Sequence, residues 1–162
     1  MLYFSVQELC VSGSHPKLVQ VPKQGTAEYR NIVALIEKLL DPLRAKLGRP
    51  IRVTSGYRPY ALNKAVGGSP TSNHKIACAA DIHTGNDSTD NILIVKSLLE
   101  LKIPYDECII EGAKFNTNGE IVSAQWIHVA YRSTGNRMKL LWTKDFKTYN
   151  KVKVENKIIV KK

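Results

Sequence analysis

An amphipathic segment near the N-terminus limits the fold more than any other feature. In TAEYRNIVALIEKLLDPLRAKLG, residues 26–48, apolar side chains recur three and four positions apart, which predicts a helix with one buried face. These apolar positions are Ile32, Leu35, Ile36, Leu39 and Leu43. Thr26 can cap the start of this helix and Gly48 can end it. Pro42 predicts a break or bend, because proline removes a helical hydrogen bond.

Short strands alternate with helices in the rest of the chain. We expect strands at 51–54, 74–83, 107–112 and 120–131, and helices within 59–68 and 90–101. Asn118 and Gly119 lie between the last two strands and favour a hairpin. The pattern therefore predicts an α+β fold, in which a small, mostly antiparallel sheet has helices on one face and a functional site on the other.

The length of 162 residues, 43% of them hydrophobic, is sufficient for one domain with a core. We interpret residues 1–162 as a single domain, with residues 1–26 as an irregular arm and residues 132–162 as peripheral strands. Cys10, Cys78 and Cys108 lack the CxxC spacing of a structural zinc knuckle, so we expect reduced, buried thiols.

The chain is strongly basic, with 24 Lys and Arg against 14 Asp and Glu and a net charge of +10. Such a charge favours polyanionic surroundings, for example nucleic acid, teichoic acid or an acidic wall. The basic residues are not interleaved with aromatic side chains as in a strand-binding groove, so we expect a solvated basic face and no nucleic-acid partner.

Two of the four histidines occur in settings that suit a metal ion. His74 precedes Asp81 by seven residues, and His128 lies in the expected hairpin strand WIHVAY. Two imidazoles and one carboxylate would leave a fourth tetrahedral position open, as in catalytic rather than structural zinc sites. Spacing alone leaves open that these are ordinary core or surface histidines.

The run IRVTSGYRPYALNKAVGGSPTSNHKIACAADI, together with WIHVAY, closely resembles the D-Ala-D-Ala metallopeptidases of the hedgehog/DD-peptidase fold, in the branch of phage endolysins and murein peptidases. The resemblance covers most of residues 4–131. It implies that His74, Asp81 and His128 bind Zn²⁺, that Arg58 faces the substrate, and that the ion activates water against a peptide bond. This family usually has glycine where the chain has Ala77.

The general base requires a separate argument. Several members of the family that this chain resembles have a catalytic carboxylate three residues before the last histidine, and here that position is Gln125. If the hairpin loop has two or four residues, Glu111 lies opposite Trp126 and shares a face with His128. We therefore predict Glu111 as the base, with the weaker alternatives Glu120 and Asp106.

Other residues of the motifs are expected around the substrate. Ser55 and Ser72 either hold their turns in place or hydrogen-bond the substrate, and Trp126 forms a wall of the cleft or packs in the core. His83 shares strand parity with Asp81, although an exposed histidine is the simpler interpretation. Cys78 is expected to be a core thiol rather than a fourth ligand.

The resemblance implies a zinc peptidase that cuts peptidoglycan stem peptides or cross-links, as a D,D-carboxypeptidase or endopeptidase or as an L-alanyl-D-glutamate endopeptidase. The alternatives are an inactive zinc-containing module that binds wall polymers or a protein, and a nucleic-acid-binding domain. The sequence shows no secretory leader pattern and no membrane span. We expect cytoplasmic synthesis, a monomer, and action on the wall after release by a phage holin or delivery in a virion.

Overall fold

The computed structural model describes residues 1–85, 87–155 and 158–161. Its helices are α1 (Ala27–Leu35), α2 (Asp41–Leu47), α3 (Tyr60–Ala65) and α4 (Asn91–Leu101). Its strands are β1 (Arg52–Ser55), β2 (Ala79–His83), β3 (Glu107–Glu111), β4 (Lys114–Phe115), β5 (Ile121–Ser123), β6 (Trp126–Ala130), β7 (Lys139–Thr143), β8 (Asn150–Glu155) and β9 (Ile158–Lys161). Within the described residues, none of the helices is long and apolar enough to cross a membrane.

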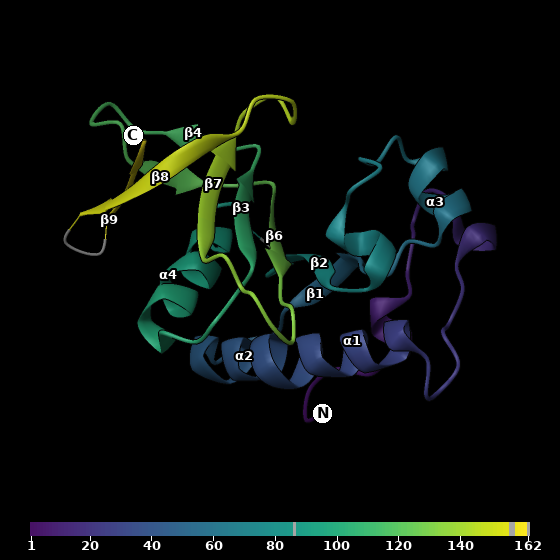
Figure 1. Cartoon of the computed structure of the whole chain (residues 1–162). Helices are drawn as coiled ribbons and strands as arrows, with labels where there is room; N and C mark the ends of the chain where they lie inside the picture. The colour runs from purple at the N-terminus through teal and green to yellow at the C-terminus, as the bar shows by residue number, and fades with distance from the viewer. Residues whose placement is uncertain (86, 156–157, 162) are drawn as a thin grey trace.

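Seven of the described strands form one sheet in the order β1-β2-β6-β3-β7-β8-β9 (Figure 1). Neighbours are antiparallel except β3 and β7, which are parallel. Alternate residues of the central strands pack with the helices in one apolar core, whose members include Ile82, Ile110 and Val129 from the sheet and Leu39 and Leu98 from the helices. The fold is α+β with a mostly antiparallel sheet, as predicted.

The N-terminal helical segment continues through Pro42, so the predicted break is absent. A π-helical turn, Ile36–Leu40, joins α1 to α2. Proline has no N–H, and the wider π turn just before it absorbs the missing hydrogen bond without ending the helix. Thr26 caps α1 by accepting a hydrogen bond from Tyr29 N, and Gly48 ends α2 with a left-handed φ of 70°, as the sequence predicted.

The predicted hairpin is more complex than one pair of strands. Its second arm divides into β5 and β6, and the short β4–β5 ladder forms a separate sheet at the turn. The β3–β6 register nevertheless places Glu111 opposite Trp126. The described part of residues 132–162 holds three strands, and β7 lies inside the main sheet beside β3 rather than at its periphery.

The N-terminal arm packs closely against the turn that follows β1. Phe4, Val6 and Leu9 are buried in the core. A Cβ atom added at Gly56 would lie 2.1 Å from the carbonyl oxygen of Leu9, so only glycine allows this approach. The three cysteines are free and buried, as expected for structural thiols.

Candidate metal centre

His74 lies on a 3₁₀ turn, Asn73–Ile76, which Ser72 caps by accepting a hydrogen bond from His74 N. The Nδ1 atom of His74 lies 2.7 Å from the carbonyl oxygen of Gly56. A carbonyl only accepts, so Nδ1 carries the proton and Nε2 presents a lone pair. The turn ends at Ala77 with a left-handed φ of 59°, a conformation that glycine adopts most readily.

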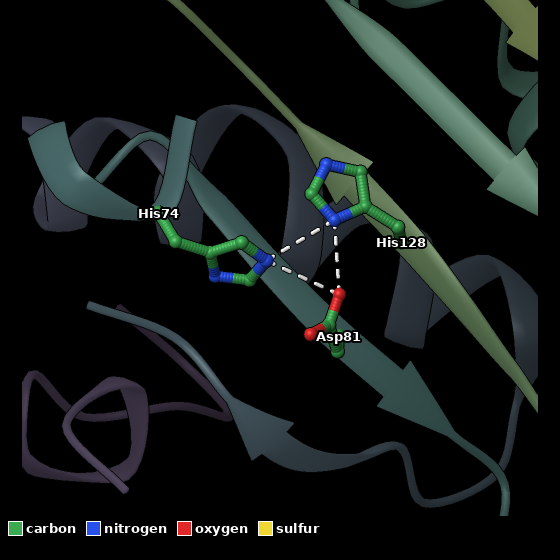
Figure 2. Close-up of side chains that lie close together, drawn as sticks. All are labelled: His74, Asp81 and His128. Atoms are coloured by element: carbon green, nitrogen blue, oxygen red, sulfur yellow. Dashed lines mark hydrogen bonds and ion pairs between the residues drawn. The ribbon is translucent and has the colours of Figure 1, made fainter. Parts of the chain in front are cut away.

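Asp81 and His128 are paired residues on the neighbouring strands β2 and β6. His128 Nδ1 lies 2.9 Å from Asp81 Oδ1, and His74 Nε2 lies 3.2 Å from the same oxygen. The two imidazole nitrogens are 3.1 Å apart, and all three side chains point toward one another (Figure 2). Segments 54 residues apart in sequence thus bring three donor atoms together.

This cluster fits a metal ion. Ligands about 2.0–2.1 Å from a tetrahedral Zn²⁺ are separated by about 3.3 Å, close to the three separations observed. Two imidazoles and one carboxylate are donors that Zn²⁺ accepts. Without a cation or a proton between them, the lone pairs of these atoms would repel one another, so the site is built to hold positive charge.

The electrostatics of His74 and Asp81 support the same interpretation. Burial lowers the pKa of His74, which favours the neutral form that ligates metals. Burial would raise the pKa of Asp81, but the charges and hydrogen bonds of both histidines hold it well below its usual value. His128 is also buried, yet its contact with Asp81 outweighs this and raises its pKa.

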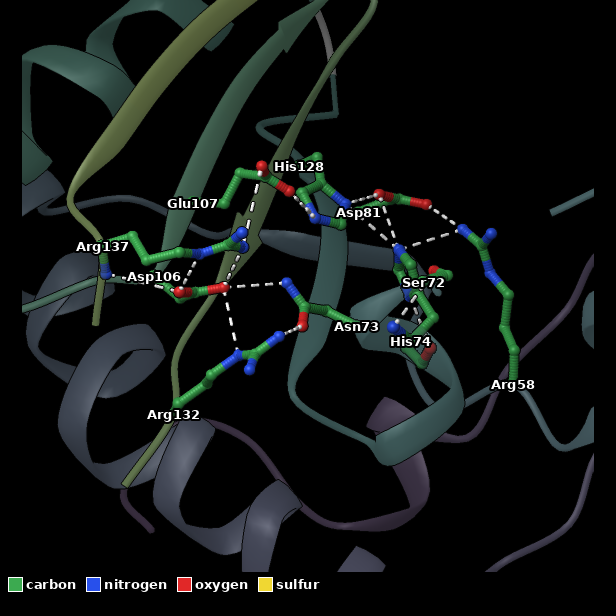
Figure 3. A network of polar contacts seen from close by, with 11 residues as sticks. Arg58, Ser72, Asn73, His74, Asp81, Asp106, Glu107, His128, Arg132 and Arg137 are labelled. Carbon is green, nitrogen blue, oxygen red and sulfur yellow. Dashed lines mark hydrogen bonds and ion pairs between the residues drawn. The ribbon is translucent and has the colours of Figure 1, made fainter. Parts of the chain in front are cut away.

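Arg58 borders the cluster. Its Nε donates to Ser55 Oγ over 2.7 Å. Its Nη2 donates to Asp81 Oδ2 and lies 3.1 Å from His74 Nε2 (Figure 3). The guanidinium thus engages one carboxylate oxygen of Asp81 and leaves Oδ1 toward the imidazoles. Ser55 positions Arg58.

Glu111 lies on the same face of the sheet as His128, as strand parity predicted. Its side chain is only 7% exposed, and Oε2 has no hydrogen-bond partner among the described residues. Burial raises the pKa of Glu111 to about 7, although the positive charge of His128 opposes this. A buried, unpaired carboxylate with a pKa near neutrality is suited to proton transfer.

A second polar network, not anticipated from the sequence, adjoins the cluster. Asp106 is fully buried and accepts hydrogen bonds from Arg137 and Asn73, and Arg132 Nε lies 3.3 Å from its Oδ2 (Figure 3). Burial would raise the pKa of Asp106, but these partners outweigh it and lower the pKa. Asp106 therefore anchors this network rather than facing the cluster as a base.

Glu107 connects the two networks, since its carboxylate lies 3.9 Å from both His128 Nε2 and Arg137 Nη2. Glu107 and Glu111 are four residues apart on β3 and therefore lie on the same face of the sheet. This strand parity could have indicated from the sequence that Glu107 lies near the site.

A cleft of about 930 Å³ opens over the cluster. Its lining includes the three cluster residues together with Arg58, Ser72, Glu111 and Trp126. The weaker candidate Glu120 lies outside the lining and accepts a hydrogen bond from Asn116 in the β4–β5 turn. Gln125, which occupies the position of the family's carboxylate, is exposed and also lies outside the lining. His83 is partly buried beside Arg52, which contributes with burial to a lowered pKa.

Comparison with protein families agrees with this geometry. Residues 3–130 match the family model described as Peptidase M15. The chain belongs to this family. A comparison with curated proteins finds no match. The matched region contains His74, Asp81 and His128 and ends after β6, so β7, β8 and β9 lie beyond it.

Peptidases of the M15 family depend on a metal ion, and the His74–Asp81–His128 cluster is a suitable place for one. Family membership and the donor cluster together support a metallopeptidase, and hence a hydrolase.

Proposed function

We propose that this chain is a zinc peptidase that hydrolyses peptide bonds in the stem peptides or cross-links of bacterial peptidoglycan. The observation that carries the proposal is the convergence of His74, Asp81 and His128 in a cleft that also contains the buried, unpaired carboxylate of Glu111. Metal-assisted hydrolysis requires a bound metal ion and a nearby group that accepts a proton, and this cleft offers a donor set for the first and Glu111 for the second.

In the proposed mechanism, His74, Asp81 and His128 hold the ion. Bound Zn²⁺ supplies Lewis acidity, which polarises the scissile carbonyl and acidifies water. Glu111 removes the proton from the attacking water and delivers it to the leaving amine. Arg58, next to Asp81, stabilises the developing oxyanion or a carboxylate of the substrate.

Glu111 is preferred as the base over the other carboxylates on grounds of access and pairing. Asp106 is fully buried and engaged by arginine side chains, and Glu120 interacts with Asn116 outside the cleft. Gln125 cannot accept the proton. Because its side chain is exposed outside the cleft, the proposed mechanism does not require a carboxylate at this position.

The remaining site residues have distinct proposed roles. Ser72 and Trp126 line the cleft, so both are placed to contact the peptide. Ser55 accepts a hydrogen bond from Arg58 and thus acts on substrate binding through that arginine.

The proposed setting is the bacterial cell wall. A net charge of +10 favours adhesion to anionic wall polymers. We propose a single-domain monomer that reaches the wall by holin release or in a virion and acts there as a D,D-carboxypeptidase, a D,D-endopeptidase or an L-alanyl-D-glutamate endopeptidase.

Release of new amino groups from purified peptidoglycan tests this proposal. The zinc-loaded protein is expected to release amines, while a chelator-treated sample is not, and mass spectrometry of the fragments identifies the bond. Zinc binding without release from several wall types would contradict the peptidase and favour an inactive binding module. Salt-sensitive binding to nucleic acid without a zinc requirement would instead favour the third alternative.

A further inference from the structure

The loop between β7 and β8 lies beyond the part of the chain that matches the family, yet it forms one side of the cleft. Phe146 and Tyr149 of this loop line the cleft together with Leu141 of β7. The loop begins directly after Thr143, which pairs with Glu111 across the parallel β3–β7 ladder. Its residues therefore approach the proposed general base.

The backbone of this loop is held in a costly conformation. Phe146 has a left-handed φ of 59°, which is rare and unfavourable for a bulky residue. Asp145 Oδ1 accepts hydrogen bonds from the backbone N–H groups of Lys147 and Thr148, and the fully buried Thr143 accepts one from Phe146 N. These bonds hold the strained loop in place.

The conformation directs the ring of Phe146 onto Trp126. The two rings stack with centroids 4.9 Å apart and an interplanar angle of 6°. Trp126 lies opposite Glu111 on β6, so the stacked pair stands beside the base. Phe146 is 39% exposed and Tyr149 is 48% exposed, so neither residue is buried in the core.

We propose that Phe146, Tyr149 and Trp126 form an aromatic substrate wall, which binds an apolar group of the peptide next to the scissile bond. Leu141 and Ile109 also line the cleft, and so do residues 66–69, 71 and 72, most of which are glycine, serine or threonine. Aromatic faces bind apolar C–H groups, and a strained backbone that presents such a face is typical of functional sites. The proposal rests on the peptidase function proposed above and assigns a substrate-binding surface to it.

Replacing Phe146 by glycine separates a binding role from a structural one. Glycine adopts positive φ without strain, so Phe146→Gly removes the ring and relieves the backbone together. We expect binding of the stem pentapeptide L-Ala-γ-D-Glu-L-Lys-D-Ala-D-Ala to weaken about tenfold. Zinc affinity should not change, and the denaturant midpoint should stay the same or rise.

Binding is measured by calorimetry on the zinc-loaded protein in a Glu111→Gln background, which prevents turnover. Tyr3→Ala is the matched control, because Tyr3 is 44% exposed and lies outside the cleft lining, and it should leave peptide binding unchanged. Unchanged binding in Phe146→Gly would overturn the proposal. So would parallel losses of binding and folded stability, which a merely structural ring predicts. Because binding is measured without turnover, the result stands apart from whether the wild-type chain cleaves peptidoglycan.

Discussion

Glu111 shows at the scale of one residue how a proposed catalytic position conflicts with stability. The residue is 7% exposed, its Oε2 has no partner in the part of the chain that the structure describes, and burial raises its pKa from the ordinary 4.5 to about 7. That shift corresponds to roughly 3 kcal/mol of unfavourable free energy when the group is charged in the folded protein. A proton acceptor in a cleft is thus retained at a cost to the fold.

The pH dependence of this cost is a testable prediction. Below about pH 4.5 Glu111 is neutral in both folded and unfolded chains, and above about pH 7 it is charged in both, so the cost develops between these values and persists above them. In metal-free protein, the stability of Glu111→Gln relative to wild type should therefore rise by about 2–3 kcal/mol from pH 4 to pH 8. Denaturant unfolding at both pH values measures it.

The same variant should lose at least about hundredfold in kcat when loaded with zinc, because a general base contributes that much or more. Zinc affinity should be retained. A fully active Glu111→Gln protein would contradict the assignment of the base, and a pH-independent difference in stability would contradict the raised pKa.

Arg58 is expected to act on turnover rather than on metal retention. Arg58→Gln should reduce kcat/KM by about a hundredfold, as the loss of one oxyanion donor does, while zinc content measured after dialysis stays near one ion per chain. His128→Ala is the matched variant that removes a proposed ligand, and it should lose the metal. If Arg58→Gln loses zinc as well, the arginine has a structural role at Asp81.

At the scale of elements, the turn after β1 contacts both the N-terminal arm and His74. Gly56 approaches the backbone of Leu9 within a distance that no Cβ atom tolerates, and its carbonyl oxygen fixes the proton of His74 on Nδ1. The packing of the N-terminal arm and the orientation of a proposed ligand therefore depend on one glycine.

Gly56→Ala should lower the free energy of unfolding by about 1–3 kcal/mol, because the arm or the turn must move. Zinc affinity should fall with it, since the carbonyl that orients His74 shifts. Gly13→Ala is the control, because a Cβ atom there meets nothing within 4 Å. Chemical unfolding and zinc titration of both variants check this, and wild-type behaviour of Gly56→Ala would refute the close approach.

At the scale of the whole molecule, the strands beyond the family match are part of the sheet. β7 covers one edge of β3 and joins it to β8 and β9. A chain ending at Tyr131 would leave the hydrogen-bonding groups of this edge of β3 unpaired, and Leu140 and Trp142 would no longer pack against the core. We expect residues 1–131 to be unfolded or aggregated by circular dichroism and gel filtration. A soluble, zinc-binding fragment would show that these strands are dispensable.

Much of the fold and the candidate site could be predicted because local patterns encode them. Apolar spacing indicated the N-terminal helix, and strand parity placed Glu111 opposite Trp126 and on the face of His128. Periodicity reports which face of an element is buried. The motif spacing, read through a family resemblance, then indicated which polar side chains share that face.

The sequence by itself determined the α+β class and the parity of Glu111, since both follow from local periodicity. It indicated the three donor residues only through the family resemblance. Only the tertiary structure decided that β7 enters the sheet parallel to β3, that Gly56 sets the protonation of His74, and that Phe146 stacks on Trp126. These depend on contacts between distant segments. Local patterns contain no information about which partner a buried face will meet.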